Sequence, residues 1–539
     1  MVTLLIGYTL GGLALRLFAI VAPFLILCIM KYNEIIQKES NVLNHEGAAA
    51  FKMSPEMELY TAAVTSALSG KFYESPKEFI ARISDLVRRV DPVFVAQLAV
   101  YTRTQMNLRS IPLLLLVELA KCHSGDDLVS RAVGKTVLRA DEISELLACY
   151  QWRNPSQGIK KLGKLSRQIQ NGLKEAFNRF DEYQFAKYDR KDAEIKMRDA
   201  LFLVHPKAKD AAQQAIFDKI VAGTLETPYT WETQLSALGQ QHFENEEAKK
   251  AAVKALWEEL LDSGKLGYMA LLRNLRNILQ AGVSPEHIER LCARISDPAQ
   301  VAKSKQLPFR FLAAYKEIMG EPNPLVGLIL EALEKAVLCS ADNIEGFDIN
   351  TNVLLACDVS GSMYVSAGNK SSIQNVDIGV LLASILRTKC KAVIAGIFGN
   401  TWELASSPIK PILANTVGIR SIANRVGYST NGYKVVDWLI DNNVKMDKVM
   451  MFTDCQMWDS HRGYYRSDKE IKDSWHKYKE MYPQAKLYLF DLAGYGTSPL
   501  DLAEQNVYLI AGWSEKIFDV LSAIDNGADA LSEIRKIDL

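Results

Sequence analysis

Five oxygen-bearing side chains in the C-terminal part of the sequence have the types and spacing of a metal site. Asp358, Ser360 and Ser362 form a DxSxS motif, which places one carboxylate and two hydroxyls at alternate positions after an apolar run. Thr430 precedes an expected helix, and Asp454 ends a second apolar run. Hard divalent cations prefer oxygen ligands, and Mg²⁺ keeps several waters, which leaves a position for an outside carboxylate or phosphate. A lone DxSxS is more often a capped turn, but in combination with Thr430 and Asp454 it predicts a Mg²⁺ site.

The same motifs argue against catalysis. They contain no histidine, lysine or second aspartate that is placed to act as a general base. Gly134-Lys135-Thr136 resembles the end of a phosphate-binding loop, but the position where that motif requires its first glycine is Val129. We therefore expect a protein that is not an enzyme.

A second group of residues has the types expected for nucleic-acid binding. Residues 157–209 contain 13 Lys and Arg residues against 7 Asp and Glu residues, although the whole chain has 63 of each class. Basic side chains at helical spacing alternate there with aromatic ones, namely Lys160, Lys161, Lys164, Arg167, Lys187, Arg190, Lys191, Phe177, Phe180, Tyr183, Phe185 and Tyr188. Such a pattern by itself is more often a solvated helix face over a core. Its assignment to phosphate binding depends on the fold.

The elements that must position these residues change character near Ser340. Before it, apolar residues recur at helical spacing, and pairs such as Ser75-Pro76 and Asp91-Pro92 mark helix starts. Helices paired by short turns indicate stacked helical repeats. After it, apolar runs alternate with helical stretches, which predicts a parallel sheet covered by helices on both faces, with ligands at the carboxyl ends of the strands. The expected strands are 352–358, 392–398, 448–454 and 486–491, and the expected helices are 376–389, 433–441 and 468–481.

Composition bounds the class of protein. A chain of 539 residues is too long for one core, and 48% hydrophobic and 23% charged residues are the values of an ordinary globular protein. The eight cysteines contain no CxxC pair, so we expect reduced thiols and no zinc cluster.

The N-terminal segment is unlike the rest of the chain. Between Leu4 and Met30 the only charged residue is Arg16, so this run is long enough to span a bilayer. A secretory signal is disfavoured because no positively charged region precedes the run. Two interpretations stay open: a membrane anchor with Lys31 and Lys38 on its cytoplasmic side, or a translation start assigned upstream of the true one at Met30.

Several stretches resemble the TROVE module of the Ro 60-kDa autoantigen family, whose bacterial members are called Rsr. The most specific is LGYMALLRNLRN, residues 266–277. The others are VLNHEGA (42–48), Lys187-Tyr188, MRDALFLVHPK (197–207), TWE (230–232) and LPFRF (307–311). The DxSxS region that follows resembles the metal-ion-dependent adhesion site (MIDAS) of von Willebrand factor A domains, with all five positions filled. Because the resemblance begins at about residue 42, it favours a wrongly assigned start in a soluble, cytoplasmic protein.

The resemblance implies a multidomain fold. An α-helical ring of HEAT-like repeats would occupy residues 41–340, and an α/β, Rossmann-like von Willebrand factor A domain at 341–539 would close the ring as a monomer, after the apolar segment 1–40. It also implies RNA quality control, in which Y-like RNAs bind the outer basic surface and single-stranded 3′ ends of misfolded RNAs enter the central hole. Bacterial family members can tether the exoribonuclease polynucleotide phosphorylase through a Y RNA.

The family's Y-RNA contacts fall on Lys187, on Arg190 or Lys191, and on His205. Lysine and arginine neutralise phosphates, and a histidine beside a turn can donate to one. The further RNA-binding candidates are Lys160 and Lys164 in the basic segment, and Arg273 and Arg276 for single strands in the hole.

Two alternatives belong to other classes of function. In one, the chain is a protein-adhesion module whose metal binds a partner's carboxylate, and the basic segment is incidental. In the other it is a membrane-anchored receptor, if the first 30 residues are genuine.

Overall fold

The computed structural model describes residues 42–66, 71–154, 165–189, 193–339, 350–368, 371–406, 408–460 and 470–539. The chain divides into two compact units, Met1–Val42 and Leu43–Leu539, and the fold below is that of the second. The apolar run before Met30, and with it the question of an anchor, lies outside the described residues. Within the described part of the chain, no helix combines the length and the apolar character needed to cross a membrane.

Helices fill the first part of this unit, as the sequence predicts. They are α2 (Pro55–Val64), α3 (Pro76–Arg89), α4 (Pro92–Thr104), α5 (Ser110–Cys122), α6 (Leu128–Thr136), α7 (Ala140–Arg153), α8 (Arg167–Phe177), α9 (Glu182–Tyr188), α10 (Met197–Val204), α11 (Ala211–Ala222), α12 (Trp231–Gly239), α13 (Glu246–Asp262), α14 (Tyr268–Arg273), α15 (Leu275–Gln280), α16 (Pro285–Ser296), α17 (Pro298–Ser304), α18 (Pro308–Ile318) and α19 (Val326–Leu338). We call α2–α19 the helical part.

Proline-based starts explain several of these boundaries. Ser75 accepts from the Glu78 amide while Glu78 accepts from that of Ser75, a capping box with Pro76 in the first turn. Asp91 likewise accepts from the Phe94 amide at 3.1 Å and starts α4. Because each cap satisfies amides that have no partner within the helix, the chain can begin a new helix immediately after the preceding turn.

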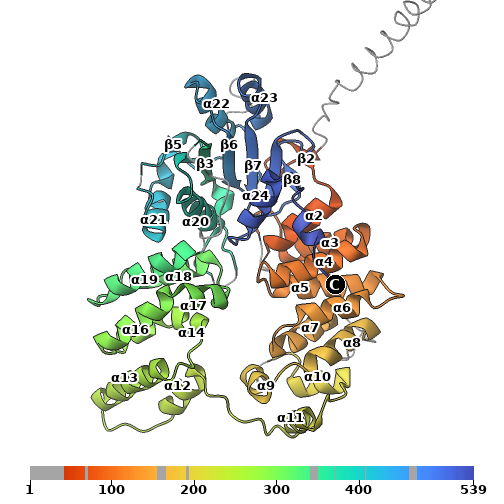
Figure 1. The fold of residues 1–539 in the computed structure, drawn as a ribbon, viewed down its shortest axis with the longest axis vertical. Helices are drawn as coiled ribbons and strands as arrows, with labels where there is room; N and C mark the ends of the chain where they lie inside the picture. The colour runs from red at the N-terminus through yellow and green to blue at the C-terminus, as the bar shows by residue number, and fades with distance from the viewer. Residues whose placement is uncertain are drawn as a thin grey trace, which may run out of the picture. The chain divides into compact units, whose positions relative to one another are not determined.

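Neighbouring helices pack on one another through much of the helical part. α4 packs on α5 and α6, α5 on α7, and α6 on α8, while near the other end α16 packs on α19 and α18 on α19. Figure 1 shows these helices following one another away from the sheet and back to it. The apolar stripe of α3 (Phe79, Ile83, Leu86 and Val87) is buried, as its spacing predicts.

A mixed six-stranded sheet follows the helical part. Its order is β5-β4-β3-β6-β7-β9, and only β5 pairs antiparallel. The strands are β3 (Asn352–Asp358), β4 (Ala392–Phe398), β5 (Trp402–Leu404), β6 (Lys448–Thr453), β7 (Lys486–Asp491) and β9 (Val507–Ala511), and the helices are α20 (Asn375–Arg387), α21 (Ile412–Ser421), α22 (Tyr433–Asp441), α23 (Ile471–Met481), α24 (Ile517–Asp525) and α25 (Ser532–Arg535), with the 3₁₀ turns η2 (Gly361–Tyr364) and η3 (Ala423–Arg425). We call this the α/β part.

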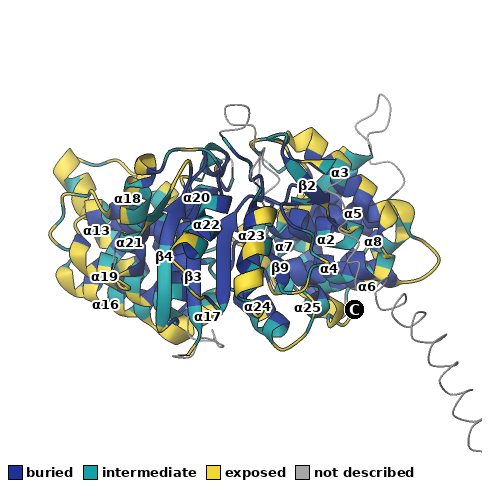
Figure 2. Ribbon diagram, turned by 90° about the horizontal axis from the view of Figure 1, so that it is seen from above, coloured by how far each residue is buried: buried dark blue, intermediate teal, exposed yellow. Residues whose placement is uncertain are grey.

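The sheet agrees with the sequence-based expectation in four strands and differs in two. β3, β4, β6 and β7 lie where they were expected, β6 ending one residue earlier. The edge strands β5 and β9 were not expected, and the antiparallel β5 makes the sheet mixed where a parallel one was predicted. In Figure 2 the central strands are buried between helices, which explains their continuously apolar sequences.

Both ends of the helical part contact the α/β part. At the first end, α2 packs on β9 and α4 on α25. There, too, β2 (Ala49–Lys52) pairs antiparallel with β8 (Thr497–Ser498), in a small sheet of order β1-β2-β8 that begins with β1 (Val42–Leu43). At the other end, α18 and α19 pack on α20 and α21. The path from one end of the helical part to the other therefore closes through the sheet.

Candidate metal-binding and RNA-binding sites

The five residues predicted to bind a metal lie in three loops at one edge of the sheet. β3 pairs with β6, and β6 with β7 in a register that places Thr453 beside Asp491, so the carboxyl ends of these three strands lie together. Asp358 ends β3, and Asp454 directly follows β6. The Gly361 amide donates to the carbonyl oxygen of Tyr428 at 2.9 Å, which brings the loop that carries Thr430 against the DxSxS loop.

Hydrogen bonds fix the ligand-bearing oxygens of this edge. One carboxylate oxygen of Asp358 accepts from the Ser360 amide at 2.8 Å, and the other accepts from the Thr453 hydroxyl at 2.7 Å. The hydroxyls of Ser360 and Ser362 lie 3.3 Å apart. All five candidate side chains are buried, with Thr430 3% exposed. We call Asp358, Ser360, Ser362, Thr430 and Asp454 the carboxylate edge.

The charges at the carboxylate edge lack compensation. Asp454 has one oxygen that accepts from the Gln456 amide at 3.0 Å, while its other oxygen is buried and has no hydrogen-bond partner among the residues that the structure describes. Burial, and then the charge of Asp358, raises the pKa of Asp454, and burial likewise raises the pKa of Asp358. A divalent cation would remove this cost, because it supplies opposite charge and takes up the free oxygen. The residues present therefore fit such an ion.

A third buried aspartate extends the edge towards the helical part. Asp491, the last residue of β7, accepts from the amides of Ala493 and Gly494 at 2.9 and 2.8 Å, and its second oxygen is buried with no partner in the described part of the chain. Gly494 has a φ of +63°, and a Cβ atom there would lie 2.5 Å from the carbonyl oxygen of Thr61. Only glycine allows this loop to approach α2 so closely.

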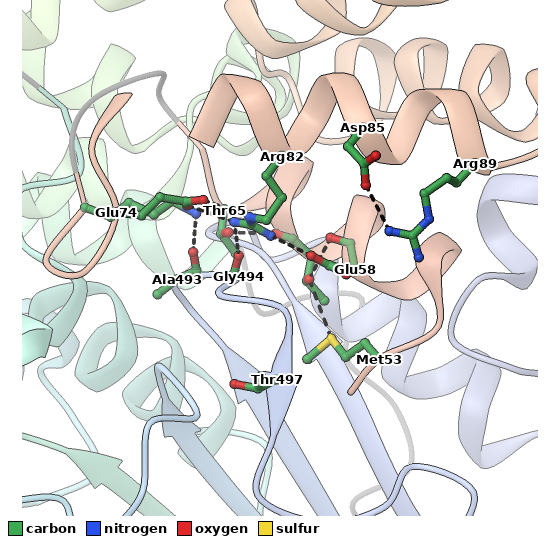
Figure 3. Close-up of polar contacts among 12 residues, drawn as sticks. Met53, Glu58, Thr65, Glu74, Arg82, Asp85, Arg89, Ala493, Gly494 and Thr497 are labelled. Carbon is green, nitrogen blue, oxygen red and sulfur yellow. Dashed lines mark hydrogen bonds and ion pairs between the residues drawn. The ribbon is translucent and has the colours of Figure 1, made fainter. Parts of the chain in front are cut away.

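Basic residues of the helical part hold the same loop. Arg82 on α3 pairs with both oxygens of Glu74 at 2.8 Å and donates to the carbonyl oxygen of Gly494 at 2.9 Å (Figure 3). Its remaining nitrogen lies 3.4 Å from the carboxylate of Glu58. The Lys71 ammonium donates to the carbonyl oxygen of Ala493. The loop after β7 is therefore held against the first helices of the helical part.

Of the RNA-binding candidates, Lys187 lies beside an aromatic hollow. It is exposed on α9, and its ammonium is 5.6 Å from the Tyr183 ring. No ion pair among the residues that the structure describes involves it. The hollow has a volume of about 280 Å³, and its lining includes Tyr183, Lys187, Tyr229, Trp231, Lys265 and Tyr268. The ammonium of Lys265 lies 4.8 Å from the Tyr229 ring, and Trp231 stacks on the buried Trp257 at 6.3 Å. We call this the aromatic hollow.

His205 occupies a turn at the end of a helix. It is the C-cap of α10 with a φ of +49°, and its side chain is exposed. The His205-Pro206 pair therefore lies in the turn between α10 and α11. An exposed imidazole in this position can donate to a phosphate.

The two arginines of the LLRNLRN stretch lie on separate helices. α14 ends at Arg273 and α15 begins at Leu275, because Asn274 leaves the helical conformation with a φ of −108°. Arg276 forms an ion pair with Glu317 on the surface, and an RNA phosphate would have to replace that carboxylate. Arg273 has no ion pair among the described residues, and burial followed by the charge of Arg273 lowers the pKa of Arg310. Both arginines are exposed, so each can contact an anion.

Four candidates lie outside the described residues: Lys160, Lys164, Arg190 and Lys191. Sequence reasoning also missed Trp231, Lys265 and Arg310. Trp231 lies in the TWE stretch and Arg310 in the LPFRF stretch, both of which carry the family resemblance. The sequence pattern does not predict which side chains of such stretches are exposed to a ligand after folding.

Comparisons with known proteins agree with this architecture. The sequence matches the TROVE domain over residues 37–241 and 215–321. The RNA-binding protein RO60 of Deinococcus radiodurans is 24% identical over 460 residues, which cover 78% of this chain and 84% of that protein. The crystal structure of the Ro (Rsr) protein of Deinococcus radiodurans matches with a TM-score of 0.56 at 20% identity, covering 86% of this chain and 99% of that one, which shows a shared fold.

The telomerase protein components 1 of Rattus norvegicus and Mus musculus are also similar. Each is 26% identical to this chain, over 329 and 307 residues that cover 48% and 44% of it. The matched region spans 12% of the length of each of these relatives.

Proposed function

Because this chain belongs to the TROVE-domain family, we propose that it binds RNA through the helical part and acts as an RNA scaffold and quality-control factor. The relative from Deinococcus radiodurans carries RNA binding in its name. The observation that carries the proposal for this chain is the aromatic hollow beside Lys187. Aromatic rings stack on bases of any sequence, and ammonium groups at the rim neutralise the backbone.

Two kinds of RNA fit two kinds of surface. The exposed Lys187 and His205 suit the backbone of a structured, Y-like RNA, which is recognised by shape and phosphates. The aromatic hollow and the exposed Arg273 suit unpaired nucleotides such as the 3′ ends of misfolded RNAs. A bound Y-like RNA would then offer a tether for an exoribonuclease such as polynucleotide phosphorylase. In this proposal the protein does no chemistry itself.

The metal is part of the same proposal. The α/β part is a von Willebrand factor A-like domain in which the carboxylate edge holds one Mg²⁺ through Asp358, Ser360, Ser362, Thr430 and Asp454. The free oxygen on Asp454 and the uncompensated buried charge support this assignment. When bound, the ion would supply positive charge and a Lewis-acidic position for an oxygen ligand.

RNA binding is tested with the full-length protein. Purified protein should carry small RNA that nuclease removes, and it should rebind a hairpin with an affinity that falls steeply as salt rises. Lys187→Ala should weaken hairpin binding and flatten the log–log salt slope by roughly 0.7 to 0.9, the value of one lost phosphate contact. The matched control is Lys477→Ala, which removes an exposed lysine on α23 of the α/β part.

Two outcomes would redirect the assignment. A protein that carries no RNA and binds neither hairpins nor single strands supports the protein-adhesion alternative. If Lys187→Ala and Lys477→Ala lower hairpin affinity equally, RNA binding is retained but does not use the surface beside α9.

A further inference from the structure

A carboxylate lies among the rings and ammonium groups of the aromatic hollow. Glu232 lines the hollow together with Tyr183, Trp231, Lys187 and Lys265. It is exposed in the first turn of α12, next to Trp231 in the sequence. A surface that only neutralised phosphates would be weakened by a negative charge here, because a carboxylate repels the RNA backbone. Glu232 is therefore suited to a group that donates hydrogen bonds.

The Glu232 carboxylate is not used to build the fold around it. Within the part of the chain that the structure describes, it forms no hydrogen bond and no ion pair. The start of α12 is capped without it, since the Thr233 amide donates to the Thr230 hydroxyl at 3.3 Å and the Thr230 amide to the Thr233 hydroxyl at 3.0 Å. Burial, and then the negative charge of Glu232, raises the pKa of Tyr183 on α9. The carboxylate is thus exposed to a ligand and lies near a ring of the hollow.

The rings of the hollow are held in place before any ligand binds. Trp231 stacks on the buried Trp257, with ring centroids 6.3 Å apart and an interplanar angle of 22°. Tyr229, in the segment between α11 and α12 (Figure 1), donates through its hydroxyl to Glu259 at 3.0 Å. The Tyr183 ring is 44% exposed. Rings that are already ordered can stack on a base with little further loss of side-chain freedom.

Two lysines decide which class of ligand fits. Aromatic rings beside a carboxylate could also bind a quaternary ammonium ion. In this hollow, however, the ammonium groups of Lys187 and Lys265 already lie 5.6 and 4.8 Å from the rings of Tyr183 and Tyr229. They repel a second cation and attract a phosphate. A nucleotide matches all three features, because its phosphate meets the lysines while its base meets the rings and the carboxylate.

The chemistry of the bases narrows the ligand further. Guanine presents two neighbouring donors, N1–H and the N2 amino group, and the two oxygens of one carboxylate can accept from both. In adenine and cytosine a ring nitrogen beside the amino group is itself an acceptor, and in uracil the single N–H lies between two carbonyl oxygens. These acceptors repel a carboxylate. The hollow, with a volume of about 280 Å³, is large enough for a purine.

We propose that the aromatic hollow is a guanine-binding site. The base stacks on the rings of the hollow, the Glu232 carboxylate accepts from N1–H and the N2 amino group, and Lys187 and Lys265 contact the adjoining phosphates. This inference deepens the proposed binding of single strands at the hollow and rests on it. Stacking alone accepts every base, whereas this arrangement selects single strands that carry an unpaired guanine.

The test measures the affinity of the full-length protein for short labelled oligouridines by fluorescence anisotropy. The strands carry a single guanosine, inosine, adenosine or cytidine, or no substitution. The guanosine strand should bind on the order of tenfold more tightly than plain oligouridine, as expected for a bidentate contact to a base. Inosine keeps N1–H but lacks the N2 amino group, so its strand should have an intermediate affinity.

Glu232→Gln should abolish the preference for guanosine without weakening the binding of plain oligouridine, because a negative charge is removed. The matched control is Glu247→Gln. Glu247 is also exposed and is also the second residue after an N-cap, that of α13, so both substitutions change the electrostatics of a helix start alike. Glu247→Gln should keep the full preference. Choline at constant ionic strength should not displace the guanosine strand from the parent protein.

The outcomes separate this inference from the proposed function. If the parent protein binds all strands alike and Trp231→Ala weakens them equally, the hollow accepts any base, so the guanine assignment is wrong and single-strand binding stands. A preference that survives in Glu232→Gln, an equal loss for every strand, or displacement by choline also overturns the guanine assignment. If the parent protein binds no single strand, both assignments are wrong.

Discussion

Replacing Glu334 by alanine should loosen the junction between α19 and α21. The Glu334 carboxylate accepts from three successive backbone amides, those of Ile412, Leu413 and Ala414, at 2.7, 3.0 and 2.9 Å. These amides form the first turn of α21, whose N-cap, Pro411, provides no side-chain acceptor. The Glu334 carboxylate on α19 therefore caps the N-terminus of α21 in place of an N-cap side chain.

The magnitude follows from the number and kind of these bonds. A neutral N-cap side chain stabilises a helix by about 1 kcal/mol, and a hydrogen bond to a charged acceptor is roughly twice as strong as one to a neutral acceptor. In Glu334→Ala, three backbone amides lose their acceptor at the same time. We expect Glu334→Ala to lower the free energy of unfolding by about 2 to 4 kcal/mol. Glu331→Ala is the matched control: Glu331 lies one turn earlier on α19, is exposed, and among the described residues its ion pair is with Lys335 at 2.8 Å.

The assay is hydrogen exchange of the amides 412–414, combined with urea unfolding. A loss of 2 kcal/mol corresponds to about thirtyfold faster exchange of these amides. Exchange should be unchanged in Glu331→Ala, whose ion pair is on the surface and contributes at most about 1 kcal/mol. If the two variants exchange alike, the carboxylate does not cap α21 and the junction is held by apolar packing alone.

Three further predictions concern the proposed sites. Trp231→Ala should weaken binding of single-stranded RNA about tenfold in a filter assay and leave a hairpin nearly unaffected, because one stacked base is worth about 1 to 3 kcal/mol. Without divalent cations, the folded protein holds protons on Asp358 and Asp454 that the unfolded chain has released, so the free energy of unfolding should fall as pH rises above 3.8 towards neutrality. Saturating Mg²⁺ should remove that slope in urea titrations. Asp358→Ala should lose the Mg²⁺-dependent rise in Tm yet keep RNA affinity, since its site lies in the other part of the chain.

The sequence predicts a helix or strand correctly where a single periodicity or a single short motif determines that element. The continuous apolar run at residues 352–358 is a strand with those bounds, and Ser75-Pro76 starts a helix as predicted. The strand Val507–Ala511 was missed because five residues at a sheet edge carry too weak a signal beside the helix that follows. Asn274 breaks the LLRNLRN stretch, which helical spacing alone presents as one helix.

Of each site, the sequence predicts only the residues that lie close together along the chain. Asp358, Ser360 and Ser362 stand at alternate positions within five residues, so their spacing predicts that they share a ligand. Asn44 and His45 contact the loop after β6 from the other end of the chain, and no periodicity connects positions so far apart. The aromatic hollow is likewise formed by α9 and by residues around α12 and α14, which meet only after folding.

The contact between α2 and β9 has a consequence for synthesis on the ribosome. Tyr60 on α2 donates to the carbonyl oxygen of Ala511 at 3.1 Å, and Leu59, Tyr60 and Val64 are fully buried. At about 5 to 20 residues per second, the partner strand is translated on the order of half a minute to a minute and a half after α2. During that interval the apolar face of α2 is exposed on the nascent chain, where it can aggregate or bind a chaperone. The order of translation therefore makes this helix, the first of the path, one of the last to be covered.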